Sequence, residues 1–211
     1  MSRRKPKRSP RRTQPSANTR SILMIGGIAA VAIVGVLAAL ILVTGSSSTG
    51  ATGFTAVPNG YPYPVQAIER INDRSHFPLG QTYNGYNSNP PTSGPHAAQP
   101  ANWGVHDEPV AKEQAVHNME HGGSVVWYNC NAAPALSSDD CTQLRNDLSS
   151  IVLPLAAAGK HILMTPYDGM DSRIALTSWG FLDKFDQFDA TRVSKFIDTF
   201  TCNFDPEHFC G

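Results

Sequence analysis

The sequence has 211 residues, of which 41% are hydrophobic and only 16% are charged, against roughly 25% charged in an ordinary soluble domain. Its 17 basic and 17 acidic residues are unevenly placed, because eight Lys and Arg residues and no Asp or Glu fall within residues 1–20. The other 191 residues hold nine basic and 17 acidic side chains, a formal charge of −8. Nucleic acid, which needs a cationic face, is therefore excluded as the expected partner of this acidic body.

The chain begins with a basic segment that is followed by an apolar one. Residues 1–20 are rich in Pro and Arg, which predicts a disordered tail in the cytoplasm. Residues 21–43 (SILMIGGIAAVAIVGVLAALILV) carry no charge and exceed the about 20 apolar residues that span a bilayer. They are predicted to form a single transmembrane helix whose C-terminal side is extracytoplasmic. Small residues near its end leave open whether the segment is ever cleaved as a signal peptide.

The remainder of the chain divides into a linker and one domain. Residues 44–60 are rich in Gly, Ser and Thr and are predicted to be a linker, whereas residues 61–211 suffice for one domain with a single core. The lipid bilayer is the expected partner of residues 21–43. A membrane-protein partner would pack against small residues of the same segment, namely Gly26, Ala30, Gly35 and Ala39.

The first half of the domain lacks any periodic pattern. Residues 83–109 are crowded with Pro, Gly and Asn, yet they also carry Tyr and Trp residues that a flexible linker would not contain. A stretch of this length without secondary structure is usually functional or disordered. We therefore expect a long, ordered, Pro/Gly-rich loop that holds its side chains at fixed positions, with a turn directly before His96.

The second half shows helix and strand patterns. Residues 111–119 are predicted to form a short helix that stops at Gly122-Gly123, and residues 124–129 a buried strand. A helix is predicted at residues 137–158, ended or kinked by Pro154, and an amphipathic helix at residues 191–201. Two further strands are predicted at residues 161–165 and 173–179. This order predicts an α+β domain of two layers, with a small sheet and two or three helices.

The cysteines agree with export. All four lie beyond the apolar segment, on the side of a membrane where disulfides persist. Three connectivities are open, and local pairing of Cys130 with Cys141 and of Cys202 with Cys210 is favoured because it closes the smallest loops. The absence of a CxxC motif favours structural disulfides over redox activity.

Histidines four residues apart offer a metal site. On a helix, His117 and His121 project from one face within reach of a single ion, and Glu120 lies beside them. The alternative is that histidines near a helix C-terminus are simply favoured by the helix dipole. The segment His117–His121 is also H-x-x-E-H, the inverted zinc-protease motif. The domain is small for a peptidase, and the only Glu downstream of the motif is Glu207, in the Cys202–Cys210 tail, so a zinc hydrolase is the less favoured interpretation.

Four segments carry a family resemblance: Tyr86–His96 (YNSNPPTSGPH), Trp103–Pro109 (WGVHDEP), Val116–Tyr128 (VHNMEHGGSVVWY) and Ile174–Gly180 (IALTSWG). In this order and spacing they resemble the bacterial family called domain of unknown function 3105, over about residues 74–200. The resemblance implies a membrane anchor and an exported domain, and no established activity. Its histidine motifs fall on His76, His96, His117 and His121. His106 stands where the family pattern has Tyr.

The sequence thus predicts a membrane-anchored extracytoplasmic domain that binds one copper or zinc ion. The expected ligands are His76, His96, His117 and His121, and Glu120 is expected to orient an imidazole or take a proton from bound water. His161 and His208 are expected to be structural or exposed. The alternative is a non-catalytic accessory module of a membrane or envelope complex, in which these residues form a hydrogen-bonded network. The sequence assigns no catalytic residue and favours binding over catalysis.

Overall fold

A computed structural model describes residues 56–210, within the second of two compact units of the chain (Ala51–Gly211). The predicted tail at residues 1–20, the predicted transmembrane segment at residues 21–43 and most of the predicted linker lie outside the described residues. Among residues 56–210, no helix combines the length and the apolar character needed to cross a membrane.

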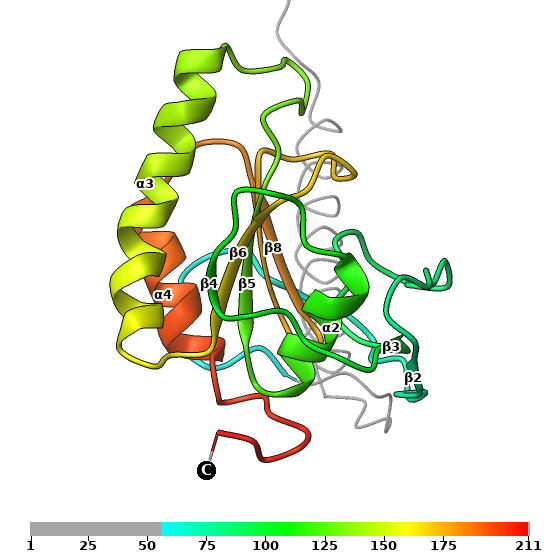
Figure 1. Ribbon diagram of the computed structural model, residues 1–211. Helices are drawn as coiled ribbons and strands as arrows, with labels where there is room; N and C mark the ends of the chain where they lie inside the picture. Colours follow the sequence, from blue (N-terminus) through cyan, green and yellow to red (C-terminus); the bar gives the residue numbers. More distant parts are fainter. Residues whose placement is uncertain (1–55, 211) are drawn as a thin grey trace, which may run out of the picture. The chain divides into compact units, whose positions relative to one another are not determined.

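The domain is built on a six-stranded mixed sheet with the order β1-β8-β7-β5-β6-β4 (Figure 1). A separate pair, β2 with β3, is parallel. The strands are β1 (Gln66–Ala67), β2 (His76–Phe77), β3 (His96–Ala97), β4 (Gly104–Val105), β5 (Ser124–Tyr128), β6 (Ile162–Pro166), β7 (Ile174–Ser178) and β8 (Phe181–Phe185). Strand β6 runs parallel to β4 and β5, whereas β7 is antiparallel to both β5 and β8.

Strand β5 lies at the centre because its sequence, SVVWY, is suited to burial on both faces. All five residues are buried, as expected for a continuous apolar run rather than an alternating one. The chain returns from β5 to its parallel neighbour β6 through helix α3 (Ser138–Ala157), which supplies the long crossover that parallel strands require. The predicted α+β class is confirmed, and three helices are present in the described part of the chain.

The sheet is covered on both faces, so the expectation of two layers is wrong. Helices α3 and α4 (Ala190–Phe200) pack on one face, against Val126, Met164 and Leu176. Helix α2 (Lys112–Glu120) packs on the other face, against Val125, Trp127 and Leu163. Figure 1 shows the two groups of helices on opposite sides of the strands. The third layer was not predicted because helix α2 is short and the rest of this layer is the aperiodic segment before it.

Helix boundaries follow capping side chains. Ser137 caps α3 by accepting a hydrogen bond from the amide of Asp140 (3.1 Å), and Asp189 caps α4 in the same way with Arg192 (3.0 Å). Helix α3 was predicted to end or kink at Pro154; it continues past this residue to Ala157, so the first of these two alternatives is wrong. A proline in the last turn removes the partner of one carbonyl only, that of Ser150, and Ser150 is exposed to water.

The favoured disulfide pairing is confirmed: Cys130 is bonded to Cys141 and Cys202 to Cys210, which accounts for all four cysteines. The first disulfide joins the end of β5 to the first turn of α3. The second closes residues 202–210, called here the C-terminal loop, directly after α4.

The segment predicted to be an ordered loop contains two short strands, β3 and β4, that the sequence did not indicate. Its residues from Pro91 to Ala97 are buried, consistent with an ordered loop. Strand β8 was also missed. Its sequence, FLDKF, places two charged residues in its centre, one of which, Asp183, is buried against Arg192.

Candidate metal centre

Helix α2 presents two of the predicted ligands at its C-terminal end. His117 lies in its last turn and His121 is its C-terminal cap. The helix stops at Gly122, whose φ of +77° is the left-handed conformation that glycine favours. The amide of Gly122 then donates to Met119 (3.0 Å) and that of Gly123 to Asn118 (2.9 Å). The predicted Gly-Gly stop is therefore what places His121 at the helix terminus.

The other two predicted ligands are paired through their backbones. In the parallel bridge between β2 and β3, His76 is the direct partner of His96. Their rings lie 4.6 Å apart, edge to face. Residues 20 positions apart in the chain are thus held side by side, and no local sequence pattern announces this pairing.

Strand β3 is joined to helix α2, which brings the His76–His96 pair next to His117. Asn118 both donates to and accepts from the backbone of Ala101 (2.9 Å each), which anchors the segment after β3 on the helix. The ring of His117 then stacks on that of His76, with centroids 4.9 Å apart and planes 5° apart. It also lies 4.9 Å from the ring of His96, edge to face.

Backbone carbonyls orient the two buried imidazoles. The Nδ1 of His96 lies 2.8 Å from the carbonyl oxygen of Gly94, and the Nδ1 of His117 lies 2.7 Å from that of Ala97. A carbonyl can only accept, so Nδ1 carries the hydrogen in both rings and Nε2 of each neutral ring presents a lone pair. One potential ligand atom from each of His76, His96 and His117 lies within 4.8 Å of the others.

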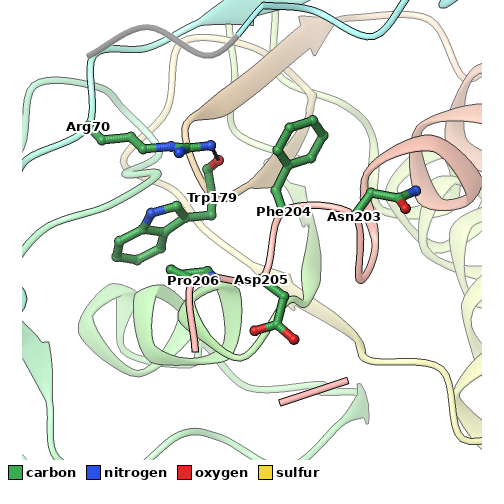
Figure 2. A pocket seen from close by; sticks show the side chains of 6 residues that line it. All are labelled: Arg70, Trp179, Asn203, Phe204, Asp205 and Pro206. Atoms are coloured by element: carbon green, nitrogen blue, oxygen red, sulfur yellow. Dashed lines mark hydrogen bonds between the residues drawn. The ribbon is translucent and has the colours of Figure 1, made fainter. Parts of the chain in front are cut away.

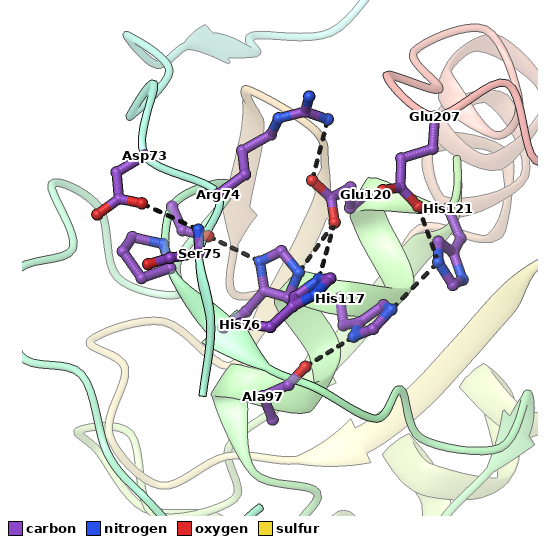
Figure 3. Close-up of polar contacts among 12 residues, drawn as sticks. Asp73, Arg74, Ser75, His76, Ala97, His117, Glu120, His121 and Glu207 are labelled. Carbon is purple, nitrogen blue, oxygen red and sulfur yellow. Dashed lines mark hydrogen bonds and ion pairs between the residues drawn. The ribbon is translucent and has the colours of Figure 1, made fainter. Parts of the chain in front are cut away.

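Glu120 adds a buried carboxylate to the cluster (Figure 3). Its Oε2 lies 2.9 Å from Nε2 of His96 and 3.5 Å from Nε2 of His76, and its Oε1 accepts a hydrogen bond from Arg74 at 3.1 Å. Within the described residues, neither of these two buried atoms, Oε2 of Glu120 and Nε2 of His96, has a hydrogen-bond partner. Such orphaned buried atoms are costly unless a cation or a proton serves them.

The charge state of Glu120 follows from opposing effects. Burial raises the pKa of its carboxyl group, but the proximity of His96, Arg74 and His76 outweighs burial and lowers the pKa. Burial lowers the pKa of His117, against the hydrogen bond to Ala97, and the charges of His121, His96 and His76 lower it further. His117 is thus neutral and Glu120 ionised at neutral pH, which are the forms that bind metals.

His121 extends the cluster toward the C-terminal loop. Its Nε2 lies 3.1 Å from Nε2 of His117 and 3.1 Å from Oε2 of Glu207 (Figure 3). The ring of Phe209 stacks on His121 with centroids 4.2 Å apart. All four predicted histidines therefore lie in one continuous cluster, with His121 at its edge.

The chain matches the family described as "Protein of unknown function (DUF3105)" over residues 79–209, more than half of its length. It belongs to that family. The match includes His96, His117, His121 and Glu207, whereas His76 lies before it. No curated protein and no solved structure matches this chain.

Two residues of the DUF3105 cluster were not predicted. Arg74 and Glu207 were not predicted as members of the cluster because each reaches it only through tertiary structure, from the segment before β2 and from the C-terminal loop. The sole sequence signal was that Glu207 is the only Glu downstream of H-x-x-E-H. Within this motif, Glu120 is buried and contacts Arg74, His96 and His76.

The remaining histidines lie outside the cluster. The Nε2 of His106 contacts the carbonyl of Asn102 (2.8 Å), and His208 is exposed. His161 stacks on Trp103, with centroids 4.8 Å apart, and its Nδ1 lies 3.3 Å from Sγ of Cys210. His161, Cys202 and Cys210 also form a compact group of donors, but the two sulfur atoms are bonded to each other and offer no thiolate.

The DUF3105 domain also has an open cavity of about 230 Å³ beside the C-terminal loop. Figure 2 shows its lining: Arg70, Trp179, Asn203, Phe204, Asp205 and Pro206. The guanidinium of Arg70 lies 3.5 Å from the carbonyl of Trp179, and burial lowers its pKa. None of the predicted metal ligands lines this cavity.

Proposed function

We propose that this DUF3105 protein is anchored in a membrane by residues 21–43 and binds a transition metal ion on its extracytoplasmic domain. The predicted ligands are His76, His96, His117 and His121, with Glu120 beside them. The observation that carries the proposal is the orientation of His96 and His117, whose Nδ1–H groups are directed to backbone carbonyls while their Nε2 atoms face the cluster. Metal-binding histidines typically use their second nitrogen in this way.

The donor set limits the choice of metal. Imidazole nitrogens and carboxylate oxygens suit Zn²⁺ and Cu²⁺, and the cluster contains no thiolate that would favour Cu⁺. Two ligands of one ion with bonds of about 2.1 Å stand at most about 4.2 Å apart. Ligand atoms of the three grouped histidines lie within 4.8 Å of one another, and His76, the exposed member, can rotate to close this gap.

The proposal is tested by metal analysis of the full-length protein purified in detergent. After removal of metal with a chelator, Zn²⁺ or Cu²⁺ is added, the excess is removed, and bound metal is measured by elemental analysis. We expect stoichiometric metal, and its loss when His96→Ala and His117→Ala are combined. The matched control combines His106→Ala and His208→Ala, which lie outside the cluster. Equal metal content in the two double variants, or none in the unaltered protein, would contradict the proposal.

A second candidate function is that of an accessory module whose histidines form a structural network. The hydrogen bond from Arg74 to Glu120 favours it, because this cation already compensates part of the carboxylate charge. In that case the combination of His117→Ala and His121→Ala unfolds the domain, whereas a metal site tolerates it. Circular dichroism and proteolysis of this variant distinguish the two functions.

The membrane topology is a separate part of the proposal. The eight basic residues before position 21 favour a cytoplasmic N-terminus, and both disulfides favour an oxidising compartment for the domain. The test adds a protease to cells whose cytoplasmic membrane is intact and whose outer envelope layers admit the protease. The protease should remove a C-terminal tag. Digestion of the tag only after the membrane is broken would contradict this topology.

A further inference from the structure

The C-terminal loop is attached directly to the end of helix α2. The amide of Cys202 donates to the carbonyl of Gly122 (2.8 Å), and within the loop the amide of Cys210 donates to Asp205 (2.7 Å). A Cβ atom at Gly122 would lie 2.7 Å from Sγ of Cys210 and 2.9 Å from Cβ of Asp205. Only a glycine therefore permits this approach, which brings Glu207 to His121.

The donor atoms of the cluster fall into two sets of equal composition. In the first set, Glu120 contacts the imidazoles of His76 and His96 at 3.5 and 2.9 Å. In the second, His121 contacts both His117 and Glu207 at 3.1 Å. Each set offers two imidazole nitrogens and one carboxylate. Figure 3 shows Glu120 and Glu207 approaching the histidines from different elements, the helix and the C-terminal loop.

The two carboxylates of the cluster lie against different histidines. With bonds of about 2.0–2.2 Å, ligands of a single ion lie within about 4.4 Å of one another. Among residues 56–210, the ion-pair contacts of Glu120 with histidine involve His76 and His96, and those of Glu207 involve His121. The two carboxylates thus contact different imidazoles: Glu120 lies against His76 and His96, and Glu207 lies against His121.

We propose that the cluster is a two-ion centre, in which His117, His121 and Glu207 hold the second metal ion. The inference rests on the proposed function and extends it to the stoichiometry of the site. The first ion is bound by His76, His96 and Glu120. Two imidazoles and one carboxylate leave coordination positions open for water at each ion. Two carboxylates also supply the negative charge that a pair of divalent ions requires, in a body of net charge −8 outside residues 1–20.

The C-terminal loop is therefore part of the site rather than a simple tail. Its disulfide closes the loop that carries Glu207, which reduces the ordering needed when the ion binds. Phe209, stacked on His121, fixes the plane of that imidazole from the same loop.

The test measures Zn²⁺ stoichiometry in the full-length protein and in the variant Glu207→Gln, which keeps the shape of the side chain and removes its charge. The matched control is Glu69→Gln, at an exposed position away from the cluster. We expect two Zn²⁺ per chain in the unaltered protein and in the control, and one in Glu207→Gln. Combining Cys202→Ser with Cys210→Ser, which releases the loop, should also leave one.

A spectroscopic measurement gives an independent result. Two Cu²⁺ ions bound at neighbouring sites interact magnetically, so their paramagnetic resonance signal should be broadened or weakened, and Glu207→Gln should restore the signal of an isolated ion. One Zn²⁺ per chain with an isolated Cu²⁺ signal would overturn the two-ion centre and leave the proposed function intact. No bound Zn²⁺ or Cu²⁺ in the unaltered protein would overturn both.

Discussion

Glu120 and His117 show how neighbouring residues prepare single side chains for metal binding. Burial alone would raise the pKa of the Glu120 carboxyl, but the proximity of His96, Arg74 and His76 lowers it below its usual value. Burial lowers the pKa of His117 and so favours the neutral imidazole, which is the form that binds a metal ion. The sequence predicted which residue types would gather here. It could not predict the carbonyls of Gly94 and Ala97 that select the nitrogen facing the cluster, because these contacts form only when the loop and α2 pack together.

At the residue scale, the metal-free protein should lose stability with acid in two pH ranges, one that begins near pH 6.5 and one that begins near pH 4.5. The folded-state pKa of His117 is lowered, so its contribution is complete above the unfolded value of about 6.5 and is lost as pH falls from there toward the folded value. The pKa of Glu120 is also lowered, and its contribution is lost as pH falls below about 4.5 and through the folded value.

Urea unfolding of the metal-free full-length protein at a series of pH values measures both ranges. His117→Gln should flatten the dependence below pH 6.5 and leave the lower range unchanged, whereas Glu120→Gln should flatten the lower range. An unchanged slope below pH 6.5 in His117→Gln would show that another group titrates there.

At the element scale, prediction succeeded where the pattern was local. Helices α2, α3 and α4 and strands β5, β6 and β7 follow runs of apolar residues, caps and glycine stops that lie within each segment. Two-residue strands carry no such pattern, so β1 to β4 could not be predicted. The bridge between β2 and β3, which places His76 opposite His96, depends on the packing of a long loop against α2.

Helix α4 is joined to β8 by a buried ion pair that is central to its stability. Asp183 is 1% exposed and accepts hydrogen bonds from Arg192 (2.9 Å) and Tyr61 (3.1 Å). Arg192→Met leaves a buried carboxylate without its cation and should cost about 3–5 kcal/mol in the free energy of unfolding. The control is Lys160→Met, which removes the exposed pair with Asp198 and should cost about 1 kcal/mol or less. Chemical denaturation measures both, and equal costs would contradict the argument.

Asn118 connects helix α2 to the loop that carries His96. Asn118→Ala removes both hydrogen bonds to Ala101 and should cost about 1–3 kcal/mol, because Asn118 is fully buried. The control is Asn203→Ala, where one exposed hydrogen bond to Thr199 is lost and a change within about 0.5 kcal/mol is expected. Since the same contact aligns β3 with α2, Asn118→Ala should also weaken metal binding, which the control should not do.

At the scale of the whole molecule, two short loops closed by disulfides and one long ordered loop surround a mixed sheet. The disulfide pairing was predicted from loop size alone, because cysteines 11 and eight residues apart favour local closure. The layering was not predicted, because the cover on the second face of the sheet has no periodic signal. The cluster lies on this second face of the sheet, where α2, β2, β3 and the C-terminal loop come together. Metal binding should therefore be coupled to the stability of the whole domain.

Metal should therefore stabilise the full-length protein against heat. A ligand that binds the folded state at 100 times its dissociation constant adds about 2.7 kcal/mol, which raises the Tm of a domain of this size by about 5–10 °C. Calorimetry with added Zn²⁺ should show this shift in the unaltered protein and in the combination of His106→Ala with His208→Ala. The combination of His96→Ala with His117→Ala should show none. A full shift in that variant would place the stabilising ion elsewhere on the protein, since these two buried imidazoles lie at the centre of the cluster.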